Sequence, residues 1–303
     1  MKRKRAAGIL FHPTSLPGPY GIGDMGHEAF EFADFLAAAG AELWQVLPLG
    51  PTGYGNSPYS SRSSFAGNEL LISPEVLVDD GFLNLETLDE CPAFPKDKID
   101  FSIVETWKYK LLHKAAGNFL EMIDKQGNKE LQKDFADFCL RHIYWLNDYA
   151  LYMSMCDEFQ DSRWYEVWDR DIGFRDPKAI EFWTKKKEME IRERKVMQYF
   201  FFSQWKRLRK YVNDLGIELI GDIPIFTASD SADTWAKLYL FKIDQDRAFA
   251  KVSGVPPDFF SDTGQLWGTP VYNWEASREE GFSWWLKRID ASLLLADIVR
   301  IDH

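Results

Sequence analysis

The sequence is poor in cysteine and lacks long apolar runs. Its three cysteines, Cys91, Cys139 and Cys156, form no C-x-x-C pair, so neither a disulfide framework nor a thiolate zinc site is predicted. An odd number of thiols suits a reducing compartment. The apolar run at residues 6–11 is too short for a signal peptide, and no run reaches the roughly 20 residues that cross a bilayer. These absences predict a cytoplasmic protein with no membrane partner.

Cationic side chains are also scarce relative to anionic ones. Lysine and arginine number 36 against 47 aspartates and glutamates, which leaves a formal net charge of −11. Such a chain repels polyanions, so nucleic acid is not expected as a partner. A neutral ligand such as a sugar is not repelled, and no obligate protein partner is implied.

Motifs for several common chemistries are missing. There is no G-x-x-x-x-G-K-[ST] phosphate loop and no G-x-S-x-G nucleophile elbow. The five histidines do not show the spacing of metal ligands. We therefore expect no nucleotide, metal or other cofactor.

Aromatic residues, in contrast, are abundant. They make up 16% of the chain and include 12 tryptophans and 12 tyrosines. Two interpretations remain open for them. Most can fill a large aromatic core, whereas some can form flat surfaces on which sugar rings stack.

The pattern of apolar residues alternates strands with helices. Strands are predicted at residues 8–11, 43–47, 217–226 and 298–301, and helices at 27–39, 196–215 and 276–294. The last strand is expected to be buried. Alternating strands and helices favour an α/β fold with a parallel sheet, as a barrel or a doubly wound sheet.

A long segment separates the second predicted strand from the third. It is interpreted as a mainly helical insertion at about residues 75–195, preceded by a short strand at 70–73. One amphipathic helix is predicted over 135–153, with His142 packed in the core. A later segment, about 250–275, is rich in glycine, proline and aromatics. We predict an irregular substrate loop there, with a loop merely pinned to the core as the alternative.

Polar side chains lie at the ends of the predicted strands. His12 follows the first, the loop at 50–59 follows the second, Asp222 lies in the third, and Arg300 and Asp302 lie in the fourth. Active sites of parallel α/β folds gather at these ends. Asp222 fits a structural carboxylate as well as a functional one. Carboxylates among aromatics and amides, without a cofactor motif, are the groups that sugar chemistry needs.

Five stretches of the sequence carry a resemblance to a known family. They are GILFHPTSLPGPYGIGD (8–24), LWQVLPLGPTGYGNSPYSSRSSFAGNELLI (43–72), IGDIPIFTASDSADTW (220–235), GVPPDFFSDTGQLWGTPVYNW (254–274) and VRIDH (299–303). Occurring together and in this order, they resemble the amylomaltases, the 4-α-glucanotransferases of glycoside hydrolase family 77 in the α-amylase clan.

The resemblance implies a TIM (β/α)₈ barrel with helical insertions. About four of its strands fall within residues 1–303, so the sequence is expected to be the N-terminal part of one catalytic barrel domain. The family's general acid and its transition-state-stabilising carboxylate match no residue here, since Glu218, Asp258 and Asp262 lie at other positions. The chain by itself is therefore expected to be an inactive fragment.

The resemblance also implies roles for particular residues. Asp302 matches the catalytic nucleophile, and Arg300 matches the arginine that orients the nucleophile and keeps it ionised. The residues that match substrate-binding positions are Asp222, His303, Tyr59, Ser57, Gln265, Trp267 and, at a secondary glucan groove, Tyr54.

The implied reaction transfers α-1,4-glucan segments by double displacement with retention. The donors would be maltooligosaccharides, amylose, glycogen or starch, and the acceptor would be the 4-hydroxyl of a glucan or of glucose. Two alternatives stay open: an α-glucan hydrolase of the same clan, and a non-catalytic glucan-binding remnant.

Overall fold

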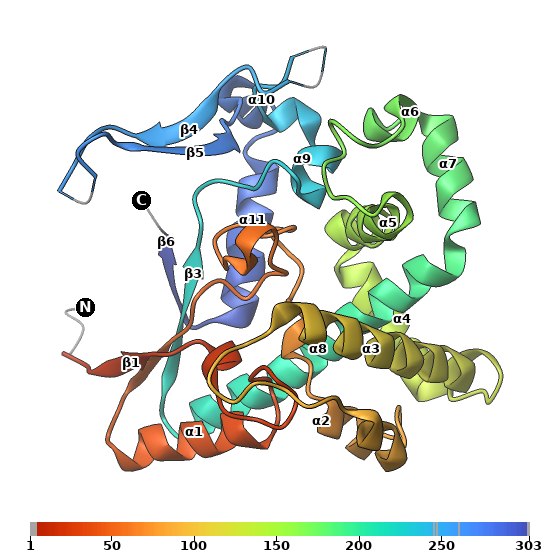
Figure 1. The fold of residues 1–303 in the computed structure, drawn as a ribbon, viewed down its shortest axis with the longest axis vertical. Helices are drawn as coiled ribbons and strands as arrows, with labels where there is room; N and C mark the ends of the chain where they lie inside the picture. Colours follow the sequence, from red (N-terminus) through yellow and green to blue (C-terminus); the bar gives the residue numbers. More distant parts are fainter. Residues whose placement is uncertain (1–4, 245, 247, 260, 302–303) are drawn as a thin grey trace.

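A parallel sheet forms one side of the molecule (Figure 1). The computed structural model describes residues 5–244, 246, 248–259 and 261–301. The sheet has the strand order β1-β2-β3-β6, and every neighbouring pair is parallel. Its strands are β1 Gly8–Leu10, β2 Leu43–Gln45, β3 Glu218–Ile223 and β6 Ile298–Ile301. The predicted α/β fold with a parallel sheet is confirmed, and the strand order follows the order along the chain.

Helices connect the strands and pack on one side of the sheet. In chain order they are α1 His27–Ala38, α2 Pro74–Asp79, α3 Phe101–Asp124, α4 Lys129–Arg141, α5 Ile143–Phe159, α6 Arg170–Gly173, α7 Pro177–Lys186, α8 Glu188–Asp214, α9 Ala232–Ala236, α10 Trp274–Glu279 and α11 Ser283–Leu295. Helix α1 joins β1 to β2, α8 leads into β3, and α11 leads into β6. Helices α2 to α7 fill the long connection between β2 and α8, where a mainly helical insertion is expected.

The core lies between the sheet and the helices packed on it. Trp44 of β2 and Leu219 of β3 are fully buried, as are Leu208 and Val212 of α8. These side chains belong to one continuous apolar cluster. Burial of this cluster supplies the main driving force for folding. It fixes the direction of the strands and so the edge at which their carboxyl ends meet.

Two predicted helices are broken in the structure. Residues 135–153 form α4 and α5, which meet at His142, and residues 276–294 are divided between α10 and α11. His142 has a non-helical ψ of 11° and accepts a hydrogen bond from Trp145 Nε1. The second break contains Phe282, whose φ of 55° is left-handed. Apolar spacing continues across both breaks, which is why periodicity does not detect them.

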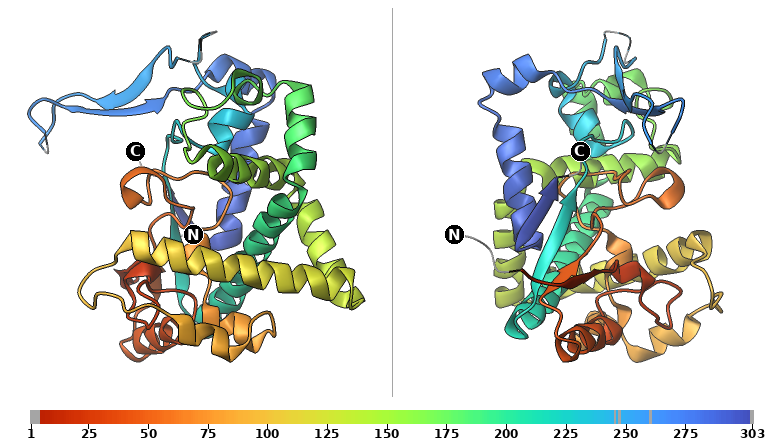
Figure 2. Two further views of the ribbon diagram at one scale, coloured as in Figure 1. Left: turned by 45° about the vertical axis from the view of Figure 1, so that its right-hand side comes forward. Right: turned by 90° about the vertical axis from the view of Figure 1, so that its left-hand side faces the viewer.

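One predicted strand and one predicted loop also need correction. Residues 69–71 form a 3-10 helix and not part of a strand at 70–73. The expected irregular loop contains an antiparallel hairpin, β4 Val252–Val255 and β5 Gln265–Pro270. Figure 2 shows this hairpin projecting away from the rest of the chain.

Strand β6 is less buried than predicted. Within the described residues it pairs with β3 on one side, and Ile301 is 57% exposed. Strand β3 ends at Ile223 and not at 226, because Pro224 has no N–H to continue the ladder.

Candidate functional site at the carboxyl ends of the strands

Asp222 is the centre of the polar groups at the carboxyl edge of the sheet. It is the fifth residue of β3, and its side chain is fully buried. One carboxylate oxygen, Oδ2, accepts hydrogen bonds from Tyr59 Oη at 2.7 Å and from Arg300 Nη1 at 2.6 Å. The other oxygen, Oδ1, is buried without a hydrogen-bond partner among the described residues. An unsatisfied buried acceptor costs free energy, so Asp222 holds a strained polar position at the end of β3.

Arg300 reaches Asp222 because of the register of the sheet. Strands β3 and β6 pair in parallel with Asp222 opposite Arg300. The guanidinium forms an ion pair with the buried carboxylate, while 46% of its own side chain remains exposed. One end of the arginine is therefore fixed, and the rest lies at the open edge of the sheet.

Tyr59 comes from the loop that follows β2. This loop is folded back on itself by an antiparallel bridge between Thr52 and Ser61 and by the bond from Gly53 N to Ser60 O at 2.7 Å. Ser57 Oγ accepts a hydrogen bond from the backbone N–H of Tyr59 at 3.3 Å. The fold thus places Ser57 behind Tyr59, where it supports the backbone that carries the phenol.

Tyr54 lies away from this group. It belongs to a 3-10 turn, Tyr54–Asn56, and its side chain is 91% exposed. The structure therefore separates Tyr54 from the cluster of Asp222, Tyr59 and Arg300. An exposed ring in this position is compatible with the secondary groove expected from the resemblance.

Gln265 and Trp267 lie on β5 of the projecting hairpin. Their side chains are joined by a hydrogen bond from Trp267 Nε1 to Gln265 Oε1 at 3.1 Å. The Trp267 ring lies 6.1 Å from the ring of Phe226, which follows β3. Phe226 in turn lines a cavity together with Asp222 and Tyr59. The hairpin is therefore connected to the Asp222 cluster through one aromatic contact.

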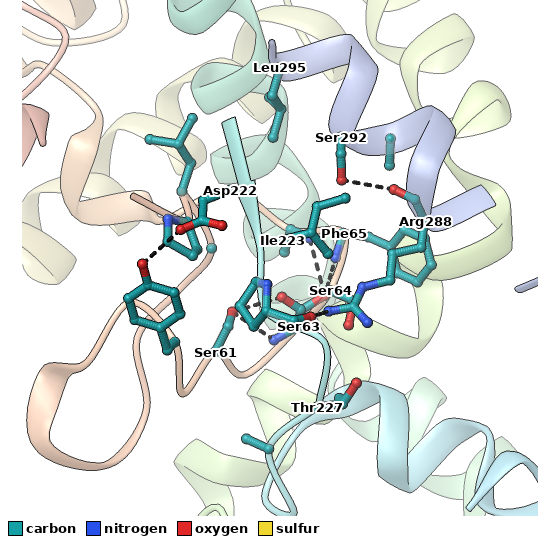
Figure 3. Close-up of a pocket in the computed structure, with 18 of the residues that line it drawn as sticks. Ser61, Ser63, Ser64, Phe65, Asp222, Ile223, Thr227, Arg288, Ser292 and Leu295 are labelled. Carbon is teal, nitrogen blue, oxygen red and sulfur yellow. Dashed lines mark hydrogen bonds between the residues drawn. The ribbon is translucent and has the colours of Figure 1, made fainter. Parts of the chain in front are cut away.

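The cavity behind Asp222 is small (Figure 3). Its volume is about 70 Å³, and it is lined by residues of the loop after β2, the end of β3 and α11. Ligand pockets are usually on the order of 300 Å³ or more. The cavity is therefore too small for a ligand of ordinary size, which leaves the open edge of the sheet as the candidate binding surface. The residues of its wall that the sequence did not reveal include Phe226, Thr227 and Arg288.

Two predicted site residues cannot be placed. Asp302, the expected nucleophile, and His303 lie outside the described residues. Their assignments stay predictions from the sequence. The structure describes Arg300, which precedes Asp302 by two positions on the same chain segment.

A glycine-rich segment lies in the connection between β1 and α1. Residues 21–26 read Gly-Ile-Gly-Asp-Met-Gly and match the G-x-G-x-x-G pattern of dinucleotide loops. In the structure the backbone N–H groups of Gly23, Met25 and Gly26 donate to Thr14 O, Leu71 O and Asp24 Oδ1. Because these donors are used within the protein, the loop does not present them to a phosphate.

No helix in the part of the chain that the structure describes is long and apolar enough to cross a membrane. The described residues likewise contain no group of three or more His, Cys, Asp or Glu side chains that could hold a metal ion.

The chain is similar in sequence to a family of known proteins. Residues 11–303 match the family described as 4-alpha-glucanotransferase, glycoside hydrolase family 77. The 4-alpha-glucanotransferase of Synechocystis is 44% identical over 304 residues, covering 100% of this chain and 59% of the relative. That of Thermus thermophilus is 43% identical over 303 residues, again with 100% and 59% coverage. The chain thus spans about 59% of the length of these curated relatives.

Solved structures agree with the sequence comparison. An amylomaltase from Streptococcus agalactiae, in complex with acarbose, superposes with a TM-score of 0.92 at 38% identity, covering 99% of this chain and 59% of that one. The amylomaltase from Corynebacterium glutamicum has a TM-score of 0.70 at 17% identity, with 98% and 40% coverage, which supports the similarity of fold.

Proposed function

The chain belongs to the 4-alpha-glucanotransferase family, glycoside hydrolase family 77, and from this we propose that the protein transfers α-1,4-glucan segments between saccharides. The observation that carries the proposal is the cluster of Asp222, Tyr59 and Arg300 at the carboxyl edge of the sheet. A buried carboxylate with one free oxygen, beside a cation and an exposed phenol, suits a neutral polyhydroxylated substrate. The four parallel strands are proposed to form part of a (β/α)₈ barrel, because their order in space is their order in sequence.

The proposed reaction is a double displacement. Asp302 attacks the anomeric carbon of a donor glucan, the glycosidic bond breaks, and a carboxylic acid protonates the departing oxygen. A glucosyl ester of Asp302 is the intermediate. The 4-hydroxyl of a second glucan or of glucose then attacks the same carbon from the other side, the ester bond to Asp302 breaks, and the hydroxyl proton passes to the carboxylate that had acted as the acid. Two inversions retain the α configuration.

The described residues have separate tasks in this scheme. Arg300 is placed close in sequence to Asp302, and a guanidinium beside a carboxylate favours the ionised form of that carboxylate. The fully buried Asp222 acts through its neighbours, because its Oδ2 holds Tyr59 and Arg300 at the open edge where the glucan lies. Tyr59 and Trp267 offer aromatic faces to the glucan, and Gln265 offers an amide. The general acid matches no residue of this sequence, so experiments belong in the full-length protein.

The first test is product analysis with maltotriose. A glucanotransferase converts maltotriose into glucose and longer maltodextrins. Hydrolysis without any chain lengthening would replace the proposal with the α-glucan hydrolase of the same clan. Binding of maltoheptaose with neither reaction would favour the non-catalytic glucan-binding alternative.

The second test concerns the nucleophile. Asp302→Asn in the full-length protein removes the attacking charge and keeps the shape of the side chain. We expect kcat to fall by several orders of magnitude while calorimetry shows maltoheptaose binding largely unchanged. Retained turnover would show that Asp302 is not the nucleophile.

A further inference from the structure

A buried arginine holds the backbone that follows Asp222. Arg288 of α11 is 3% exposed, and its Nη1 donates to Ile225 O at 3.2 Å. Its Nη2 donates to Pro224 O. Figure 3 shows the guanidinium of Arg288 directed at this segment. Residues 224 and 225 begin two positions after Asp222, so the arginine fixes the end of β3 just beyond the carboxylate.

Tyr272 completes the same arrangement. Its hydroxyl donates to Ile225 O at 2.8 Å, receives a hydrogen bond from Arg288 Nη1 at 3.1 Å and lies 2.9 Å from Thr227 Oγ1. A phenol has one donor and two acceptor sites. The donor is used by Ile225, and Arg288 and Thr227 fill the acceptors, so this buried hydroxyl is fully satisfied.

Residues 224 and 225, which Arg288 holds, lie between Asp222 and the contact of Phe226 with the hairpin. On one side is Asp222. On the other is Phe226, whose ring stacks on Tyr272 at 6.2 Å and meets Trp267 of the hairpin at 6.1 Å. Any shift of residues 224–227 would therefore move the carboxylate relative to the hairpin.

Burial of the charged Arg288 side chain carries a free-energy cost. Its guanidinium lies 5.3 Å from the ring centres of both Trp284 and Trp285 and donates hydrogen bonds to two carbonyls and a phenol. A countercharge among the described residues is the buried carboxylate of Asp233, which interacts with Arg288 through its charge and forms no ion pair with it. Burying a cation costs free energy that such partners only partly offset. An apolar side chain could pack in α11 at lower cost, which indicates a need for a defined position of the segment.

We infer that Arg288 is a positioning residue of the site. Together with Tyr272 it fixes residues 224–227, and it thereby determines the position of Asp222 relative to the hairpin that carries Trp267. This inference rests on the proposed glucan transfer. Arg288 touches neither Asp222 nor the substrate in this arrangement and acts through the backbone alone.

The chain offers a matched control for this role. Arg209 of α8 also donates to two backbone carbonyls, Leu293 O at 3.0 Å and Leu294 O at 2.6 Å. Those residues are at the end of α11, just before the amino-terminal end of β6, whereas Arg288 acts at the carboxyl end of β3. Both arginines bind backbone carbonyls where α11 packs near the sheet. Arg288 does so beside Asp222, and Arg209 does so at the opposite end of the strands.

The experiment compares Arg288→Gln, Arg288→Lys and Arg209→Gln in the full-length protein, with maltotriose as the substrate. Thermal melting measures the structural cost. The catalytic readouts are kcat, KM and the ratio of transfer to hydrolysis. That ratio is a property of each active molecule, so partial unfolding does not change it.

We expect Arg288→Gln to lower kcat/KM by about tenfold or more and to raise the hydrolysed share, with Arg288→Lys intermediate. Arg209→Gln should melt earlier but keep the wild-type ratio and a kcat/KM within about twofold. If Arg288→Gln does not fold, Tyr272→Phe, which removes the shared hydroxyl, should shift the ratio in the same direction. Wild-type ratios in the Arg288 or Tyr272 variants would overturn the inference, as would equal shifts in Arg209→Gln. A wild-type protein without transfer would instead refute the proposed function.

Discussion

At the scale of single residues, the hydrogen bond from Tyr59 to Asp222 can be tested by removing one oxygen atom. Tyr59→Phe keeps the ring and removes the hydrogen bond to Asp222 Oδ2. Hydrogen bonds to charged groups contribute about 1.5–3 kcal/mol. Without this bond, Arg300 is the one remaining side-chain partner of Asp222 among the described residues, so the carboxylate turns more freely. We expect kcat/KM for maltotriose to fall by about tenfold to a hundredfold, as measured by the initial rate of glucose release.

The control for this prediction is Tyr211→Phe. Tyr211 of α8 also donates to an aspartate, Asp34 Oδ1 at 2.6 Å, but it does so between α8 and α1. Its removal should change kcat/KM by less than about twofold. Similar losses in both variants would indicate a general destabilisation and contradict a specific role for the Tyr59 contact.

Two residues of the candidate site could be predicted from the sequence. Asp222 and Arg300 were candidates because they interrupt apolar strands, and the structure brings them together. Neither the contact from Tyr59 to Asp222, across 163 positions, nor the clamp by Arg288 could be derived from spacing. Such contacts depend on how the loop after β2 folds and on which face of α11 is buried.

At the scale of elements, two glycines of the helices differ in backbone conformation, one at a helix end and one in a helix interior. Gly216 follows α8 with a φ of 81°, and the bonds from Gly216 N to Asn213 O and from Ile217 N to Val212 O close the helix end. Gly117, within α3, has no such φ. A Cβ at either position would have no neighbour within 4 Å. The two sites therefore differ in backbone conformation and not in space.

This difference predicts substitutions of opposite sign. Gly216→Ala should reduce the free energy of unfolding by about 1 kcal/mol, because a left-handed conformation is unfavourable for alanine. Gly117→Ala should raise it by about 0.5–1 kcal/mol, because alanine favours a helix interior. Urea unfolding followed by circular dichroism measures both. A change of the same sign in the two variants would contradict the backbone explanation.

Other elements were predicted less well, for identifiable reasons. Apolar runs indicated the strands, and helical spacing of apolar residues indicated the helices between them, although β1 and β6 are largely exposed in the part of the chain that the structure describes. It missed the break at His142 and the hairpin of β4 and β5. At His142 the chain turns without losing its apolar pattern. The hairpin is mostly exposed, with Leu266 80% exposed, so burial leaves no alternating pattern by which a strand could be recognised.

At the scale of the whole molecule, the buried histidines should set the response to acid. Burial lowers the pKa of both His12 and His142 to about 4, and the nearby charge of Arg141 adds to the effect on His142. Above pH 6.5 both imidazoles are neutral in the folded and unfolded states. Below that pH the unfolded chain binds protons first, so the free energy of unfolding falls. The loss continues to about pH 4, where the folded protein also becomes protonated.

A single substitution can isolate one of these contributions. His142→Gln places a side chain without charge between α4 and α5, and its amide oxygen can still accept the hydrogen bond from Trp145. Each buried imidazole contributes at most about 1.4 kcal/mol per pH unit to the slope, and less where solvent screens it. We expect urea unfolding to show a smaller loss of stability for His142→Gln than for wild type between about pH 6.5 and pH 5. His27→Gln, at a side chain that is 70% exposed, should follow the wild-type curve. Parallel curves for wild type and His142→Gln would mean that the acid response arises elsewhere.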